Sequence, residues 1–222
     1  MQLIQLIIDG VASGCIYGLV ALGFVLIYKA TETINFAQGD ILMLGAFVAF
    51  SLIGVLGLNY ILGFVLTVMI IAVFGFFLDA VVVRQIIGQP AFATVMLTIG
   101  LGFIFRGFAS IYWGTDIFSF STPFSGKITE VGGLIISYVN ISIIVGTTLL
   151  MGILFAFFSF TKIGVAMRAS SENQLAAYYM GIPVKFIFSL IWSISAGVAA
   201  IAGVLLAPIT LVDTSISLIG LK

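Results

Sequence analysis

The side chains that could do chemistry in this chain are few, and three of them stand close together. Asn35, Gln38 and Asp40 fall within residues 34–40, beside Gly39 and next to an apolar span. Amide and carboxylate groups are costly in lipid, about 2.5–3.5 kcal/mol for an aspartate at the centre of a spanning helix. We therefore expect these groups to face a wet cavity or to lie at a membrane interface.

The spacing of this motif leaves two interpretations open. Asp40 is either at the start of a spanning helix at the membrane surface, where the helix dipole favours a carboxylate, or in a broken helix deeper along a pathway. Thr94 and Thr98 lie one turn apart in a later apolar stretch, and bonding to their own helix is the favoured interpretation. Arg106 is expected to snorkel to the interface or to pair with Asp116.

Residue types that are missing exclude several kinds of chemistry. The chain has no histidine, which removes zinc hydrolase sites, Ser-His and Cys-His pairs and histidine proton relays. Cys15 is the single cysteine, so neither an internal disulfide nor a thiolate metal cage can form. The sequence has no Gly-x-x-x-x-Gly-Lys-Ser/Thr loop for ATP phosphates. We expect no enzyme, no cofactor bound by this chain and, with a net charge of +0, no nucleic-acid partner.

The composition requires membrane-spanning helices to position these residues. Of 222 residues, 62% are hydrophobic and 7% are charged, whereas soluble domains carry about 25% charged residues. The apolar runs are long and continuous, which predicts helices and not the alternating strands of a barrel. The expected fold class is all-α, a polytopic transmembrane bundle of about six spans near residues 5–28, 40–58, 60–83, 91–112, 138–160 and 186–207. A polar loop with some extended structure is predicted over residues 114–133.

The distribution of Lys and Arg predicts the orientation of the bundle. The side that includes the loop between spans five and six holds Lys29, Arg84, Lys162, Arg168 and Lys185. The opposite side holds Lys127, and also Lys222 if no further span follows the sixth. Cytoplasmic loops carry an excess of basic residues, so the first side is predicted to be cytoplasmic and the N-terminus to be outside.

Small residues recur at every fourth position in the first and last spans. One ridge consists of Gly10, Gly14 and Gly18, and the other of Ser195, Ala199, Gly203 and Ala207. Such ridges let helix backbones approach closely in lipid. Packing within the chain is the favoured interpretation, and a subunit interface is the alternative.

The loop between spans five and six has the start and stop signals of a short helix. Ser171 can cap its N-terminus, Gln174 can complete a capping box, and Glu172 then lies in the first turn. Gly181 fits the left-handed position after a helix, and a proline follows two residues later. The pattern predicts a helix over about residues 172–180. Such a short helix is marginal alone, so it should rest on the membrane interface or dock on a partner.

Three segments resemble a known transporter family. Residues 176–181, Ala-Ala-Tyr-Tyr-Met-Gly, are similar to the Ala-Ala-x-x-x-Gly core of the EAA loop of ABC importer permeases, although Leu175 stands where Glu often precedes the alanines. Residues 34–40, Ile-Asn-Phe-Ala-Gln-Gly-Asp, and residues 164–169, Gly-Val-Ala-Met-Arg-Ala, resemble branched-chain amino acid permeases of the LivH type. The resemblance extends along nearly the whole chain.

This resemblance implies a permease subunit of an ABC importer for branched-chain or related amino acids in the bacterial inner membrane. The residues implied to couple to an ATPase are Arg168, Glu172, Ala176, Ala177 and Gly181. Those implied at the translocation pathway are Asn35, Gln38, Gly39, Asp40 and Thr98. The implied partners are a second, LivM-like permease, two ABC ATPase subunits that use the ATP, an extracytoplasmic substrate-binding protein and the lipid bilayer.

Two further expectations concern the extent of the permease domain and the alternative function. Residues 1–222 are expected to form a single permease domain, and because family chains continue past a Gly-Leu-Lys like residues 220–222, the domain is expected to be incomplete at its C-terminus. The alternative function is a secondary transporter or channel for a small polar solute, which would need acid or base relays within the spans.

Overall fold

The computed structural model contains six helices that are long and apolar enough to cross a membrane within the residues it describes, which are 2–32, 34–86, 89–119, 122–131 and 134–221. These spans are Leu3–Thr31, Gln38–Val55, Tyr60–Ile86, Phe92–Tyr112, Tyr138–Phe160 and Val184–Leu206. Their ends differ from the predicted ones by only a few residues, because the apolar runs themselves set the helix lengths. The all-α membrane bundle is therefore confirmed.

The chain alternates long helices with short connections. The helices are α1 (Gln2–Thr31), α2 (Gln38–Ala49), α3 (Tyr60–Val81), α4 (Ala91–Tyr112), α5 (Tyr138–Phe160), α6 (Lys162–Glu172), α7 (Gln174–Tyr179) and α8 (Val184–Leu206). A π-helical segment, η1 (Phe50–Val55), continues α2, and 3-10 helices η2 (Val83–Ile86) and η3 (Thr214–Leu221) follow α3 and α8. Strands β1 (Ile128–Val131) and β2 (Leu134–Ser137) pair antiparallel. They confirm the extended structure expected around residues 114–133, of which 120, 121, 132 and 133 lie outside the described residues.

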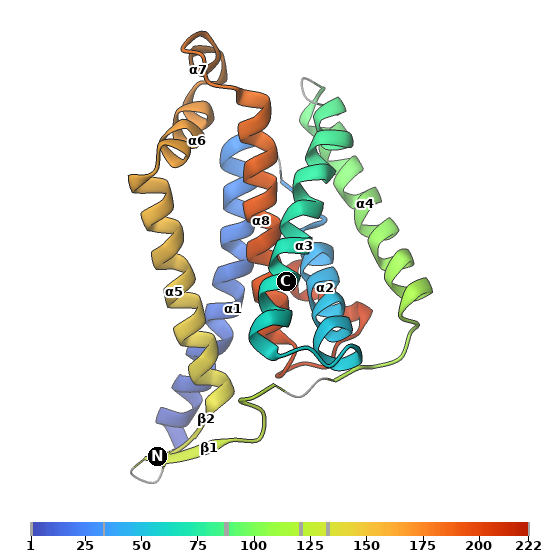
Figure 1. Cartoon of the computed structure of the whole chain (residues 1–222), viewed down its shortest axis with the longest axis vertical. Coiled ribbons are helices and arrows are strands. Elements are labelled where there is room, and N and C mark those ends of the chain that lie inside the picture. Colours follow the sequence, from blue (N-terminus) through green and yellow to red (C-terminus); the bar gives the residue numbers. More distant parts are fainter. Residues whose placement is uncertain (1, 33, 87–88, 120–121, 132–133, 222) are drawn as a thin grey trace.

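The short helix α7 and the β1–β2 hairpin lie at opposite ends of the bundle (Figure 1). At the α7 end, Ser171 donates a hydrogen bond to the Lys29 carbonyl, and Arg84 donates one to the Lys185 carbonyl. The basic residues predicted to share one side of the membrane therefore lie at one end of the fold. Lys222 lies outside the described residues, and the orientation in the membrane stays a prediction.

Helix α8 is the centre of the bundle because its small residues let neighbouring helices approach. Of its 23 residues, 16 are buried. A Cβ atom on Gly203 would collide with the Leu42 carbonyl oxygen of α2, and one on Gly45 of α2 would collide with Ala200. The other small residues of the predicted ridge are buried as well: Ser195, Ala199 and Ala207. For this ridge, the favoured interpretation of packing within the chain is confirmed.

The glycine ridge of α1 is different. A Cβ atom added to Gly10, Gly14 or Gly18 would meet no atom within 4 Å. The expectation that this ridge packs inside the chain is therefore wrong for the part of the molecule that the structure describes. Helix α1 packs through another face, on which Ile16 and Leu19 are buried.

This contrast predicts unequal effects of the same substitution. Gly203→Ala should lower the free energy of unfolding by about 1–3 kcal/mol, because the methyl group forces α8 away from α2. Gly14→Ala, which fills open space, should leave it nearly unchanged. Thermal unfolding in detergent, followed by circular dichroism, measures both. Equal melting temperatures for the two variants would contradict the close contact between α2 and α8.

Candidate functional site

The polar motif that precedes and opens α2 lies deep in the bundle. Asn35, Gln38 and Asp40 are each at most 1% exposed, and α2 occupies the half of the bundle away from α7 (Figure 1). The Ser195 hydroxyl of α8 donates to the Gly23 carbonyl at 2.8 Å and to Gln38 Oε1 at 3.3 Å. Gly23 precedes the end of α1 at Thr31 by about 12 Å at 1.5 Å per residue. Of the two interpretations, the break deep in the fold fits this geometry.

Side-chain hydrogen bonds hold the turn into α2 together. The Asn35 side chain accepts a bond from the Ala37 N–H at 3.1 Å, which forms an Asx turn. Its Nδ2 donates to Gln38 Oε1 at 3.3 Å, and Gln38 Nε2 donates to the Ser195 carbonyl at 3.4 Å. Gln38 fits here only because Gly23 has no side chain, since a Cβ atom at that position would collide with Gln38 Nε2. The two amides are thus bonded to each other and to the α8 backbone, and Gly23 of α1 provides the space for Gln38.

Thr98 connects α4 to the same turn. Its hydroxyl donates to the Val95 carbonyl at 3.0 Å, as expected for a threonine that bonds its own helix. The same oxygen also accepts a bond from the Phe36 N–H at 3.2 Å. The sequence indicated the first bond, but it could not indicate the second, because the two residues lie 62 positions apart.

Asp40 forms an ion pair with Arg106 of α4. Arg106 Nε lies 2.6 Å from Oδ1 and Nη2 lies 3.4 Å from Oδ2, a two-bond arrangement that suits a guanidinium and a carboxylate. The expectation that Arg106 snorkels or pairs with Asp116 is therefore wrong. A buried carboxylate needs a partner in lipid, and Gly102 lets α4 approach, since a Cβ atom there would collide with Asp40 Oδ2.

The polar cluster of Asn35, Gln38, Gly39, Asp40 and Thr98 thus joins α1, α2, α4 and α8. The structure brings all five of these predicted pathway residues to one place and buries them. The sequence reasoning missed Arg106 and Gly23 as members, and it treated Ser195 only as a packing residue. Gly23 and Ser195 are small residues in apolar helices, a pattern that indicates close approach but not its partner.

At the predicted coupling helix, in the loop between spans five and six, helix α7 begins two residues later than predicted. Asn173 caps it, with Oδ1 accepting a bond from the Ala176 N–H at 2.9 Å. Ser171 is not the cap; it lies in the last turn of α6 and bonds to the Lys29 carbonyl. Glu172 ends α6 and does not open α7. The prediction failed here because the chain is already helical from residue 162, and asparagine caps as well as serine.

The end of α7 follows the predicted pattern. Gly181 has a positive φ of 82°. Its N–H donates to the Tyr178 carbonyl at 3.0 Å, and the Ile182 N–H donates to the Ala177 carbonyl at 3.0 Å. These two bonds make a Schellman motif, and Pro183 then stands at the N-cap of α8. The direct joint means that α7 and α8 have little freedom to move apart.

Helix α7 lies at one tip of the molecule (Figure 1), and large apolar side chains are exposed there. Of the predicted coupling residues, Ala177 is buried, and the exposed ones are Arg168, Glu172, Ala176 and Gly181. Four large side chains are between 66% and 82% exposed: Leu175, Tyr178, Tyr179 and Met180. Such a group beyond the ends of the spans is typical of a surface that binds another protein.

A second polar network ties α3 to α8 near this tip. Arg84 Nη2 donates to the Lys185 carbonyl at 3.0 Å and also bonds to the Ser189 hydroxyl. Ser189 donates to Asp79 Oδ2 at 2.6 Å, and Arg84 lies 3.6 Å from the same oxygen. The first turns of α8 are therefore fixed to the end of α3 as well as to α7.

Comparison with known proteins agrees with this arrangement. Residues 6–221 match the family described as the branched-chain amino acid transport system permease component. The chain belongs to this family. The resemblance to this permease family is thereby confirmed, and the alternative of a secondary transporter or channel is not supported.

The similar curated proteins in this family are permease proteins from bacteria and an archaeon. The chain is 28% identical over 215 residues to BraD of Pseudomonas aeruginosa, a high-affinity branched-chain amino acid permease protein, covering 91% of this chain and 70% of BraD. It is 28% identical over 218 residues to LivH of Escherichia coli K12, covering 93% and 71%. A probable LivH of Methanocaldococcus jannaschii is 29% identical over 196 residues, covering 85% and 61%. No solved structure gives a significant match.

The ion pair can be tested from the neighbouring helix. Gly102→Ala should displace the Asp40 carboxylate from Arg106 and lower the free energy of unfolding by about 3 kcal/mol, since a buried charge loses its partner. Gly100→Ala, on the same helix, adds a methyl group where no atom lies within 4 Å and should have little effect. Thermal unfolding in detergent compares the two. A melting temperature for Gly102→Ala equal to that of Gly100→Ala would rule out the pair as a stabilising contact.

Proposed function

We propose that this chain is a permease subunit of an ABC importer for branched-chain or related amino acids, and that residues 1–222 act as one permease domain. The observation that carries the proposal is the capped helix α7 with its exposed apolar side chains, in a chain of this permease family. The names of BraD and LivH support the substrate class. Few polar groups in the spans could select a solute, so selectivity would depend largely on a substrate-binding protein.

The proposed coupling step begins at α7. Two ABC ATPase subunits hydrolyse ATP, since this chain has no phosphate-binding loop of that kind, and one of them receives α7 in a groove on its surface. The residues proposed for this contact are Arg168, Glu172, Ala176, Ala177 and Gly181. Because only residues 180–183 separate α7 from α8, a displacement of α7 would move the central helix of the bundle.

The remaining partners follow from the same assembly. A second, LivM-like permease subunit completes the membrane part, and an extracytoplasmic binding protein delivers the amino acid to the end opposite α7. With the orientation predicted from Lys and Arg, α7 lies in the cytoplasm and the spans cross the bacterial inner membrane. No cofactor is assigned to this chain.

The proposed translocation pathway passes the polar cluster of Asn35, Gln38, Gly39, Asp40 and Thr98. In the structure these groups are buried, and hydrogen bonds join Asn35 to Gln38 and the Phe36 N–H to Thr98. They lie where α1, α2, α4 and α8 meet, so a shift of α8 would separate Ser195 from Gln38 and open polar groups toward a passing amino acid. Alternating access then corresponds to the closed and open forms of this cluster.

Removal of a helix cap tests the coupling step. Asn173→Ala deletes the cap of α7, about 1 kcal/mol, and a helix of only six residues should fray as a result. ATP-driven leucine uptake into vesicles that contain the assembled transporter should fall several-fold, with the amount of folded protein unchanged.

Asn59→Ala is the matched control for that substitution. Asn59 caps α3 in the same way, accepting from the Ile61 N–H at 3.0 Å, and it is also exposed. This variant should keep its uptake rate. If both variants transport equally well, α7 does not couple ATP hydrolysis to transport.

A substitution in the cluster tests the pathway. Thr98→Val keeps the shape of the side chain but leaves the partly buried Phe36 N–H without its acceptor, a loss of about 1–3 kcal/mol. The turn into α2 should loosen, and the KM for leucine uptake should change by several-fold. Thr94→Val, one turn away on the same helix, is the control. A Thr98→Val variant that is less stable but has an unchanged KM would assign the cluster a purely structural role.

A further inference from the structure

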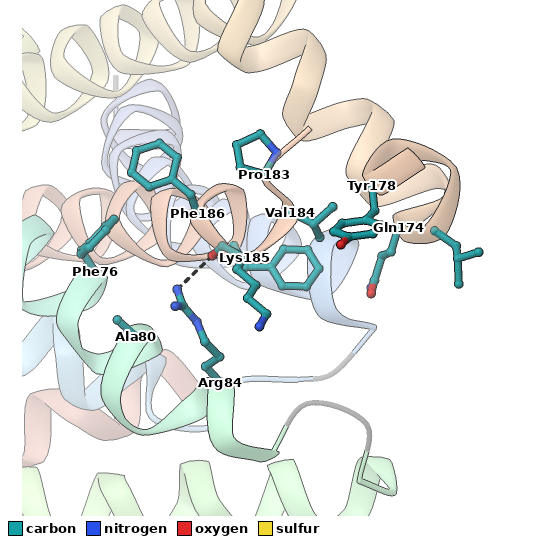
Figure 2. A pocket seen from close by; sticks show the side chains of 11 residues that line it. Phe76, Ala80, Arg84, Gln174, Tyr178, Pro183, Val184, Lys185 and Phe186 are labelled. Carbon is teal, nitrogen blue, oxygen red and sulfur yellow. Dashed lines mark hydrogen bonds between the residues drawn. The ribbon is translucent and has the colours of Figure 1, made fainter. Parts of the chain in front are cut away.

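A groove of about 890 Å³ opens at the α7 end of the bundle, between the ends of α3, α7 and α8 (Figure 2). Phe76 of α3 and Phe186 of α8 form one wall, with ring centroids 6.0 Å apart in an edge-to-face arrangement. Leu175 and Tyr178 of α7 also line it. Phe186 is 49% exposed, so the apolar wall continues onto the outer surface of a spanning helix, where lipid chains lie.

The groove is positively charged. Its lining includes Arg84 and Lys185 and no acidic residue in the part of the chain that the structure describes. Figure 2 shows both side chains extending into the same space, with Arg84 bonded to the Lys185 carbonyl. Buried Asp79 balances Arg84, which leaves the exposed Lys185 ammonium as the cation in excess.

Two further features add to this positive character. Arg84 Nε is buried and has no hydrogen-bond partner among the described residues. Helix α8 begins at the groove; its Val184 and Phe186 N–H groups donate to the Ile182 and Pro183 carbonyls at 2.8 and 2.9 Å, so the contribution of this end is the helix dipole. The positive end of the dipole of a 23-residue helix therefore faces the same opening, and such ends bind phosphate groups readily.

The position of the cations fits the depth of lipid headgroups. Arg84 lies near the end of the span Tyr60–Ile86, and Lys185 near the start of the span Val184–Leu206. A ligand that satisfies both the charges and the aromatic wall must carry a phosphate at this level and apolar chains running toward the bilayer. Basic pockets between spanning helices bind acidic lipid headgroups in this way.

We propose that this groove binds an anionic phospholipid, with the phosphate at Lys185 and Arg84 and an acyl chain along Phe76 and Phe186. The lipid would fill the space between α7 and the spans and would support the short helix from below. With the predicted orientation, it belongs to the cytoplasmic leaflet.

Native mass spectrometry of the purified chain in detergent tests this site directly. The chain is mixed with equimolar dioleoyl phosphatidylglycerol and dioleoyl phosphatidylethanolamine, and we expect preferential retention of the phosphatidylglycerol. Lys185→Gln should lower that retention about five-fold, the effect of one surface cation on an acidic lipid. Lys162→Gln, at the start of α6 on the same end of the molecule and outside the groove lining, should retain the lipid as the unmodified chain does.

Three results would overturn the proposal. They are equal retention of the two lipids, an equal loss in the Lys162→Gln control, and displacement of the phosphatidylglycerol by soluble glycerol phosphate, which would show a simple phosphate site. The measurement needs neither ATPase partners nor transport. Its failure would therefore leave the proposed permease function untouched, and a loss of leucine uptake would not bear on the lipid.

Discussion

The absence of hydrogen-bond partners in the hydrocarbon core is the constraint on which the rest of this fold depends. A polar group inside the bilayer must find its partner within the protein. Asp40 meets this demand with Arg106, at 2.6 Å, and Gln38 meets it with Ser195 and Asn35. These contacts fix where α2 begins and which faces of α4 and α8 must turn inward.

Helix α8 connects the two ends of the proposed mechanism. Its first turn follows α7 through Pro183 and is held to α3 by Arg84. Ser195, which contacts the turn into α2, lies on the same helix at about 16 Å from its start, at 1.5 Å per residue. A rigid helix moves as one body, so displacement at the tip reaches the polar cluster without an intermediate element. The small residues that let α8 pack against α2 also make this contact close.

Sequence reasoning predicted the parts of this structure that depend on local pattern. The six spans follow from the lengths of apolar runs, and the end of α7 follows from Gly181 and the proline after it. Where two signals competed, as with Ser171 and Asn173, the pattern could not decide which residue caps the helix. The partner of Arg106 lies 66 positions away, and a single sequence carries no sign of such a contact.

The pairing of the buried charges has an electrical consequence. A single elementary charge moved across the membrane potential requires about 2.3 kcal/mol per 100 mV. Asp40 is joined to Arg106 and Asp79 to Arg84, so each carboxylate moves together with a cation when the helices shift. The two displacements carry opposite charge through the same field, and their electrical work cancels. Rearrangement of this bundle is in this respect independent of the voltage across the membrane, whether the cell is energised or depolarised.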